Sequence, residues 1–220
     1  MATSAISTGI RFEGAIRHLP LKRICDIFFS LLALTLSLPL TLPLMLIIRL
    51  SSRGPAIYGQ LRIGRGGRPF MCYKFRSMYA NAEHRLQALL ESDPALGAEW
   101  QATRKLKKDP RITRIGTFLR KTSLDELPQF LNVLKGDMSV VGPRPVVAEE
   151  IAVHYGPKAN KILTVRPGIT GVWQVSGRSD TSYAERVALD EYYVDHRSLW
   201  VDLKLFSKTI PVLLTRKGAY

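Results

Sequence analysis

The 220 residues predict a mainly helical α+β fold in which one helical segment enters a membrane and the remaining chain forms a single domain. Three observations predict this class: an uncharged apolar run at residues 27–48, one pair of strand-like stretches directly after it, and helical periodicity in several later segments. Residues 1–20 are polar and rich in Ser and Thr, so we expect them to be mobile. No linker divides residues 21–220, which predicts one domain.

The apolar run is long enough to matter for a membrane, because about 22 helical residues reach across roughly 30 Å of hydrocarbon. Basic residues flank it on both sides, whereas a spanning helix usually has its basic excess on one side. Pro39 and Pro43 each lack an N–H and predict a sharp bend, with Ser37 beside the break. We therefore expect a re-entrant helix-break-helix over about residues 24–50. A kinked spanning helix and a buried core helix are the alternatives.

The charge balance calls for an anionic partner. Lys and Arg number 32 against 18 Asp and Glu, a net charge of +14, which suits nucleic acid, anionic lipid or a phosphorylated substrate. Residues 49–76, beside the apolar run, hold seven basic residues and no acidic one, which favours anionic lipid of the cytoplasmic leaflet. Two cysteines without metal-type spacing fit a reducing compartment, and four scattered histidines do not support zinc.

After the apolar run, apolar and polar residues alternate over 57–63, a Gly-rich turn follows at 64–67, and a second run covers 70–75. This pattern predicts a β-hairpin. Side chains repeat every two residues in a strand, so Lys74 and Arg76 are expected on one face, where a phosphate could bind.

Helical periodicity recurs at 79–90 and 96–106, with a break between them at Asp93 and Pro94, and we expect these helices to be amphipathic and interfacial. The tail at 199–214 mixes large apolar residues with lysines and is interrupted at Pro211. A helix lying at the lipid head groups and a helix packed on the core both fit this tail.

An acidic pair, Asp125 and Glu126, precedes an apolar helical set that stops at Gly136. Ser123 and Glu126 have the spacing of a capping box, so the pair could simply start the helix. The same position also suits a carboxylate nucleophile whose neighbour holds a cation, close to N–H groups that attract phosphate. Arginines that could bind phosphate follow in the Gly- and Pro-rich segments 142–145, 166–168 and 177–178.

Five motifs in series resemble the bacterial sugar transferase family, the monotopic phosphoglycosyl transferases. They are KFRSM at 74–78, LDELPQ at 124–129, GDMSVVGPRP at 136–145, RPGITG at 166–171 and QVSGR at 174–178. The resemblance runs from about residue 22 to the C-terminus, and it is greatest to the galactosyl-phosphate transferases of exopolysaccharide production. Members often carry Ser-Pro at the membrane break, where this chain has Ser37, Leu38 and Pro39.

The resemblance implies a cytoplasmic catalytic domain at the bacterial inner membrane. It implies transfer of a sugar 1-phosphate from a UDP-sugar to undecaprenyl phosphate with release of UMP, the first membrane step of exopolysaccharide biosynthesis. By the same resemblance Asp125 is the nucleophile that forms an aspartyl phosphosugar, and Glu126 is its partner, both close to Mg²⁺. Further positions match the family near the phosphates (Lys74, Arg120, Arg144, Arg178) or as acidic site residues (Glu149, Asp190).

Other functions stay open from the residues alone. A conventional glycosyltransferase would release UDP instead of UMP, and a non-catalytic basic membrane adaptor would release neither. Nucleic-acid binding is disfavoured because no recognition motif accompanies the charge. The resemblance suggests galactose, with glucose or another hexose as alternatives, and leaves a homodimer open.

Overall fold

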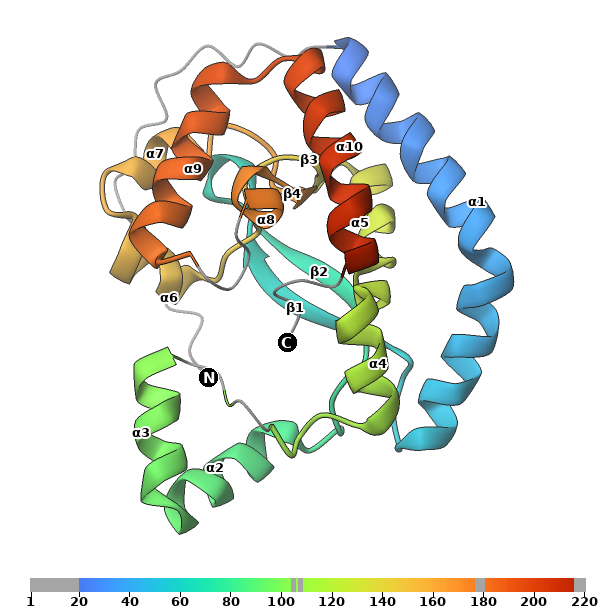
Figure 1. The fold of residues 1–220 in the computed structure, drawn as a ribbon, viewed down its shortest axis with the longest axis vertical. Coiled ribbons are helices and arrows are strands. Elements are labelled where there is room, and N and C mark those ends of the chain that lie inside the picture. Colours follow the sequence, from blue (N-terminus) through green and yellow to red (C-terminus); the bar gives the residue numbers. More distant parts are fainter. Residues whose placement is uncertain (1–19, 104–105, 107–108, 177–180, 216–220) are drawn as a thin grey trace.

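The computed structural model describes residues 20–103, 106, 109–176 and 181–215. The segment predicted to be mobile, 1–20, lies outside the described residues except for Pro20. In the described part, helices predominate over two small two-stranded sheets, which confirms the mainly helical α+β class (Figure 1).

The apolar run forms one helix, α1 (Pro20–Ser51), which follows the edge of the molecule in a bowed path (Figure 1). The helix continues through Pro39 and Pro43 rather than breaking into the two arms that the sequence predicts. Two prolines remove only two N–H donors from a helix of this length, so curvature can absorb them. The hydroxyls of Ser37 and Thr41 bond to the carbonyls of residues three positions earlier, at 3.1 and 3.3 Å. By length and apolar composition α1 could cross a membrane.

Both ends of α1 pack on the rest of the fold, whereas its middle is largely exposed. Near its C-terminal end, Leu44 and Ile48 belong to a core cluster with Phe75 and Leu119. Large apolar side chains between these ends stay open to the surroundings, among them Leu31, Leu32, Leu36, Leu38, Leu40 and Leu42. The buried-core alternative therefore does not describe this helix.

Arg76 ends α1. Its buried guanidinium donates to the carbonyl oxygens of Ile48 at 2.9 Å, Ser52 at 2.6 Å and Arg53 at 3.1 Å. Ile48 lies in the last turn of α1, where helix carbonyls lack intrahelical partners, and Ser52 and Arg53 follow the helix end directly; a cation there also suits the helix dipole. Two nitrogens of the Arg76 guanidinium are thus occupied at the end of α1, whereas Lys74 pairs with Glu126, so the two side chains that the strand period places together have different partners.

The predicted β-hairpin is confirmed. Strands β1 (Ile57–Ile63) and β2 (Pro69–Phe75) pair antiparallel, and a short 3-10 turn η1 (Arg65–Gly67) joins them. Two three-residue strands, β3 (Ser139–Val141) and β4 (Gly168–Thr170), form a separate parallel pair that the sequence did not predict. Three residues are too few to show an alternating pattern.

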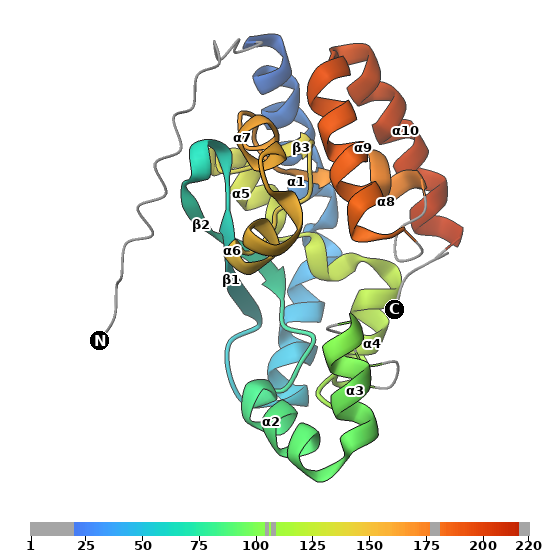
Figure 2. The same cartoon turned by 90° about the vertical axis from the view of Figure 1, so that its left-hand side faces the viewer.

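The remaining helices follow in chain order. They are α2 (Ala82–Ser92), α3 (Pro94–Thr103), α4 (Arg114–Thr122), α5 (Gln129–Lys135), α6 (Ala148–Glu150), α7 (Lys158–Ile162), α8 (Val172–Ser176), α9 (Tyr183–His196) and α10 (Leu199–Thr215). A 3-10 turn η2 (Leu124–Glu126) precedes α5, and a π-helical turn η3 (Ile151–Tyr155) follows α6. The break predicted at Asp93 is confirmed between α2 and α3, which together project from the body (Figure 2).

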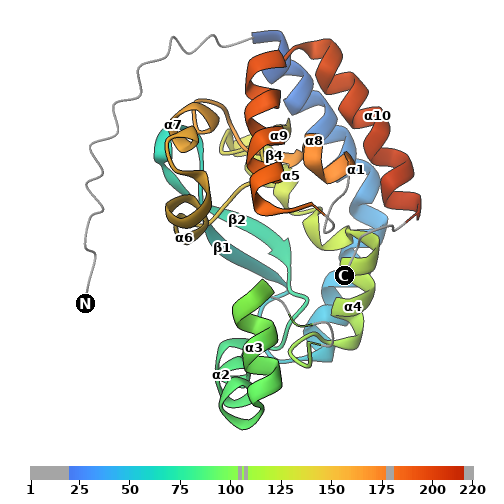
Figure 3. The ribbon, with the colours of Figure 1, turned by 60° about the vertical axis from the view of Figure 1, so that its left-hand side comes forward.

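The main core lies where α5, α9 and α10 meet the two sheets. Its buried members include Cys72, Val133, Met138, Tyr193 and Leu205. Helix α10 lies beside α1 and α9 (Figure 3) and continues through Pro211, contrary to the predicted interruption. One of its faces packs on the core through Leu205, while Trp200 and Leu203 are 76% and 50% exposed, so the helix carries features of both predicted alternatives.

Candidate active site

The acidic pair lies in a tight reversal between α4 and α5. Ser123 adopts the left-handed conformation, with φ of 56°, and its N–H bonds to the carbonyl of Arg120 at 3.2 Å. The Ser123 side chain makes no capping hydrogen bond, so the capping-box interpretation is wrong. Helix α5 ends at Gly136, as predicted, where φ is 93°. The reversal thus presents Leu124–Glu126 as a separate 3-10 turn instead of the first turn of α5.

Asp125 is buried on this turn, with 9% of its surface exposed. Burial raises the pKa of Asp125 to about 6, the charge of Lys74 opposes this, and the charge of Glu126 adds to it. Arg120 also lowers the pKa through its charge. The pKa of Asp125 therefore lies close to the physiological pH range, where a carboxyl group can gain or lose its proton readily.

Glu126 forms an ion pair with Lys74 of β2, at 2.6 Å between Oε1 and Nζ. Both side chains are about one third exposed, at 34% and 29%. Burial raises the pKa of Glu126, but the charge and hydrogen bond of Lys74 outweigh burial, and Arg144 adds to them, so the pKa of Glu126 lies below its ordinary value. The two adjacent carboxylates thus differ in character, one readily protonated and one firmly ionised.

Two arginines complete the positive surroundings. Arg120 of α4 donates from Nε to the Ser77 hydroxyl at 2.9 Å, and its charge acts on Asp125. Arg144 follows β3, its charge acts on Glu126, and its guanidinium lies 5.5 Å from the centroid of the Trp173 ring. The fourth predicted cation, Arg178, lies outside the described residues.

The two further acidic positions lie in different surroundings. Asp190 of α9 is 1% exposed, accepts a hydrogen bond from the Tyr155 hydroxyl at 3.4 Å, and receives a backbone hydrogen bond from Arg144. Burial raises the pKa of Asp190 to about 8. Glu149 lies on α6 with its side chain exposed. Asp190 therefore lies behind the Arg144 backbone, whereas Glu149 faces outward.

Arg62 is a neighbour of the site that sequence reasoning missed. It is 9% exposed on β1, donates to the carbonyl of Pro145 at 3.2 Å and to the Gln60 side chain at 2.7 Å, and interacts electrostatically with Arg144. The sequence feature that could have identified Arg62 is its position as a charged residue between apolar residues of a predicted strand. Through Pro145, it connects the hairpin to the segment that carries Arg144.

The carboxylates fit a magnesium ion. Mg²⁺ in proteins that bind phosphates is usually held by one or two carboxylates together with phosphate oxygens and water. Asp125 and Glu126 supply two carboxylates on one turn. No set of three or more His, Cys, Asp or Glu side chains that could hold a metal occurs in the described part of the chain.

Comparison with known proteins places these residues in a context. A family model described as bacterial sugar transferase matches residues 17–216. The undecaprenyl-phosphate galactose phosphotransferase of Salmonella typhimurium is 51% identical over 200 residues, which are 91% of this chain and 42% of that protein. The exopolysaccharide production protein ExoY of Sinorhizobium fredii is 48% identical over 209 residues, 94% of this chain and 92% of ExoY.

A third relative carries a different sugar in its name. The UDP-glucose:undecaprenyl-phosphate glucose-1-phosphate transferase of Escherichia coli is 39% identical over 212 residues, 91% of this chain and 41% of that protein. The chain thus spans less than half of the Salmonella and Escherichia proteins, and nearly all of ExoY.

Proposed function

The chain belongs to the bacterial sugar transferase family, and from this premise we propose that it transfers a hexose 1-phosphate from a UDP-sugar to undecaprenyl phosphate, releasing UMP, for exopolysaccharide synthesis. The observation that carries the proposal is the burial of Asp125 beside the Lys74–Glu126 ion pair and Arg120. This is a carboxylate placed among cations, as attack on a phosphorus atom between charged oxygens requires.

The first half-reaction uses Asp125 as the nucleophile. One of its carboxylate oxygens attacks the phosphorus that carries the sugar, the bond from that phosphorus to the bridging oxygen breaks, and UMP leaves with that oxygen and its electron pair. The product on the protein is an aspartyl phosphosugar. The cations Lys74, Arg120 and Arg144 offset the charge that builds on the phosphate oxygens.

The second half-reaction restores the carboxylate. A phosphate oxygen of undecaprenyl phosphate attacks the same phosphorus, the bond from phosphorus to the Asp125 oxygen breaks, and the lipid diphosphate sugar is formed. Asp125 and Glu126 would hold Mg²⁺, which when bound supplies positive charge to the diphosphate. Because the second carboxylate is kept ionised by Lys74, Glu126 is suited to hold a cation while Asp125 reacts.

Galactose is the favoured sugar. The Salmonella relative, 51% identical, is named for galactose, and the Escherichia relative named for glucose is 39% identical. UDP-galactose is therefore the first donor to test, with UDP-glucose as the competitor.

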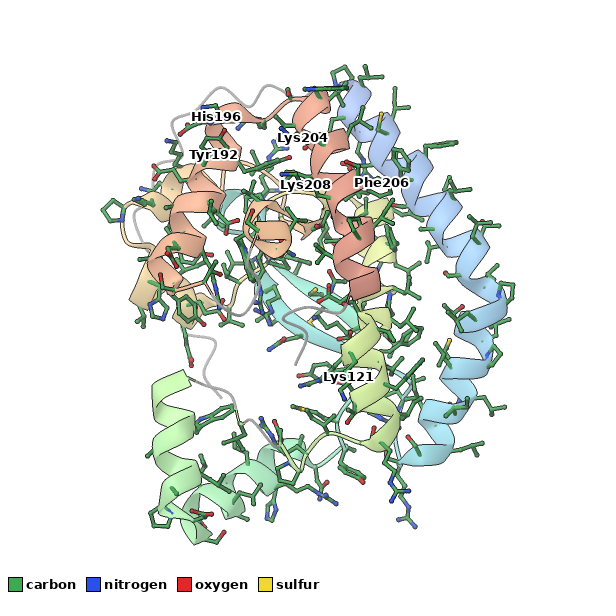
Figure 4. All side chains as sticks on the ribbon, viewed as in Figure 1. Lys121, Tyr192, His196, Lys204, Phe206 and Lys208 are labelled. Atoms are coloured by element: carbon green, nitrogen blue, oxygen red, sulfur yellow. The ribbon has the colours of Figure 1, made fainter. Side chains whose placement is uncertain are left out.

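We further propose that α1 is re-entrant and that the catalytic domain lies on the cytoplasmic face of the bacterial inner membrane. Both ends of α1 are bonded to the same domain, through Arg23 at one end and Arg76 at the other, and its exposed apolar middle is free to enter lipid. Exposed lysines Lys121, Lys204 and Lys208 on α4 and α10 (Figure 4) add charge suited to anionic head groups.

This placement is tested with single cysteines. Leu21→Cys and Arg53→Cys, each made in a cysteine-free background, should react with a membrane-impermeant maleimide in inside-out vesicles and remain unlabelled in right-side-out vesicles. Labelling of the two positions from opposite sides would make α1 a spanning helix.

The activity is tested with purified protein, Mg²⁺, undecaprenyl phosphate and UDP-galactose labelled at the β-phosphate. Label in the lipid and release of UMP are expected from the wild type, and neither from Asp125→Asn. Asp195→Asn is the matched control, since Asp195 is an exposed carboxylate on α9 that pairs with Lys161 of α7, and this variant should retain full activity. Release of UDP would indicate a conventional glycosyltransferase, and release of neither nucleotide from any UDP-sugar would indicate an adaptor.

A further inference from the structure

The first turns of α1 are bonded to strand β3. Asp26, 4% exposed, accepts hydrogen bonds at Oδ1 from the Ser139 hydroxyl and from the Val140 backbone N–H, each at 3.0 Å. The acceptor is a charged side chain, and such hydrogen bonds are stronger than neutral ones. A side chain of the apolar helix therefore fixes the backbone of the short strand that precedes Arg144.

A second group of contacts fixes the next residue of the strand. The Val141 carbonyl accepts from Lys22 Nζ and from the Tyr193 hydroxyl, each at 3.1 Å. Asp202 of α10 joins both donors, at 2.5 Å from Lys22 and 2.7 Å from Tyr193. Strand β3 is thus hydrogen-bonded directly to α1 and α9, and Asp202 of α10 holds the two side chains that bond to Val141.

From β3 to Arg144 the chain has little room to adjust. Gly142 donates to the Thr170 carbonyl at 2.9 Å, and the Pro143 carbonyl accepts from Gly168 at 2.7 Å. A Cβ on Gly142 would lie 2.6 Å from the Arg166 carbonyl oxygen, so this backbone is packed directly against its neighbour. A shift of β3 must therefore be passed on to Arg144 instead of being absorbed between them.

We propose that Asp26 is a positioning residue of the transferase reaction: from within the apolar helix, it holds β3 so that Arg144 stands at the Glu126 end of the acidic pair. This inference rests on the proposed function. It makes the membrane helix part of the scaffold of the active site as well as an anchor, with Arg144 as the group through which Asp26 acts.

The test compares Asp26→Ala with Asp26→Asn and with Ser30→Ala. Asn keeps an acceptor at Oδ1 and should restore most of the activity that Ala loses. Ser30 is the matched control, because it lies one turn further along α1, is fully buried, and its hydroxyl has no hydrogen-bond partner among the described residues. We expect Asp26→Ala to lower kcat at least tenfold with a smaller change in KM for the UDP-sugar, and Ser30→Ala to change kcat less than twofold.

A double-mutant cycle separates positioning from general stability. If Asp26 acts through Arg144, adding Asp26→Ala to Arg144→Ala should change the rate of UMP release less than twofold, measured with radiolabelled donor. Multiplication of the two single effects would overturn the proposal, as would a loss in Ser30→Ala equal to that in Asp26→Ala.

Ser139→Ala keeps the cycle informative if Asp26→Ala does not fold. It removes one of the two donors to Asp26 and leaves the Val140 N–H in place, so a smaller loss is expected, again absent in the Arg144→Ala background. These outcomes are distinguishable from failure of the proposed function. Activity in Asp125→Asn would reject Asp125 as the nucleophile. If Asp125→Asn is inactive but the effects of Asp26→Ala and Arg144→Ala multiply, only the role of Asp26 is rejected.

Discussion

Lys74 and Glu126 face each other at 2.6 Å across the junction between strand β2 and the 3-10 turn that carries Asp125. The ion pair connects segments 52 positions apart in the chain, and it is the charge of Lys74 that acts most strongly on both carboxylates against the effect of burial. The charge of a residue on the hairpin therefore acts on both carboxylates of the turn.

Replacing Lys74 by Met should move the acidic limb of activity to higher pH. Without the ammonium, the pKa of Asp125 rises further, so a larger fraction of this proposed nucleophile is protonated at a given pH. The measurement is kcat/KM for the UDP-sugar against pH, which reports the free enzyme. Lys135→Met, which removes an exposed lysine beside Tyr73, is the control and should leave the profile unchanged. An unshifted limb in Lys74→Met would contradict the electrostatic role.

In the wild type, kcat/KM should fall on acidification with a midpoint of about pH 6, because protonated Asp125 cannot attack. Substitution of Arg120 by Gln should raise this midpoint, since its charge lowers the pKa of Asp125. A midpoint near pH 4, the value of an ordinary carboxyl, would show that burial does not control the nucleophile.

Asp125→Asn should make the protein more stable at neutral pH while abolishing transfer. The pKa of Asp125 is higher in the folded than in the unfolded state, so the folded state binds the proton more tightly, and stability falls as pH rises from about 4 to about 6. Removing the charge should recover about 1–3 kcal/mol at pH 7. Thermal unfolding in lipid nanodiscs at pH 4 and pH 7 checks this, and an equal Tm difference at both pH values would refute it.

Ser123→Val should destabilise the protein by about 1–3 kcal/mol, because a β-branched residue resists the left-handed conformation at φ of 56°. Ser123→Gly removes the conformational conflict and should be tolerated. Chemical denaturation and UMP release measured together should show loss of both in the Val variant. A Gly variant as damaged as the Val variant would assign the effect to the lost hydroxyl.

Gly116→Ala should be severely destabilising. A Cβ at Gly116 would lie 1.9 Å from the backbone carbonyl oxygen of Ser77, and Ser77 also accepts the hydrogen bond of Arg120. Gly97→Ala is the matched helical control, since its nearest neighbour would be 3.8 Å away, and it should stabilise α3 by up to about 1 kcal/mol. Expression, Tm and activity of the two variants separate the steric effect from a general effect of alanine.

Features with a local pattern could be predicted from the sequence. The apolar run, the alternating hairpin and the acidic pair next to a helix all depend on neighbouring residues, and the structure contains each of them. The separate roles of Lys74 and Arg76 could not be predicted, because the strand period places them together, whereas the position of α1 decides that Arg76 binds its last carbonyls.

The capping by Arg76 and the bonds from Asp26 to β3 depend on packing between distant segments. The same holds for the burial of Asp190 under Arg144, which no local period encodes. Three-residue strands such as β3 acquire their identity only from a partner, and the partner β4 lies in another part of the chain. Sequence reasoning therefore finds elements and candidate residues more readily than it finds which backbone group each side chain holds.

The attachment of α1 at both of its ends has a practical consequence for making a detergent-free enzyme. Deleting the helix would expose Phe75 and Leu119, on which Leu44 and Ile48 pack. The loss of each large buried side chain lowers the free energy of unfolding by about 2–5 kcal/mol. Replacing only exposed leucines, such as Leu36 and Leu42, with polar residues preserves the contacts at both ends of α1. A water-soluble version therefore requires substitutions on the exposed face of α1, and not deletion of the helix.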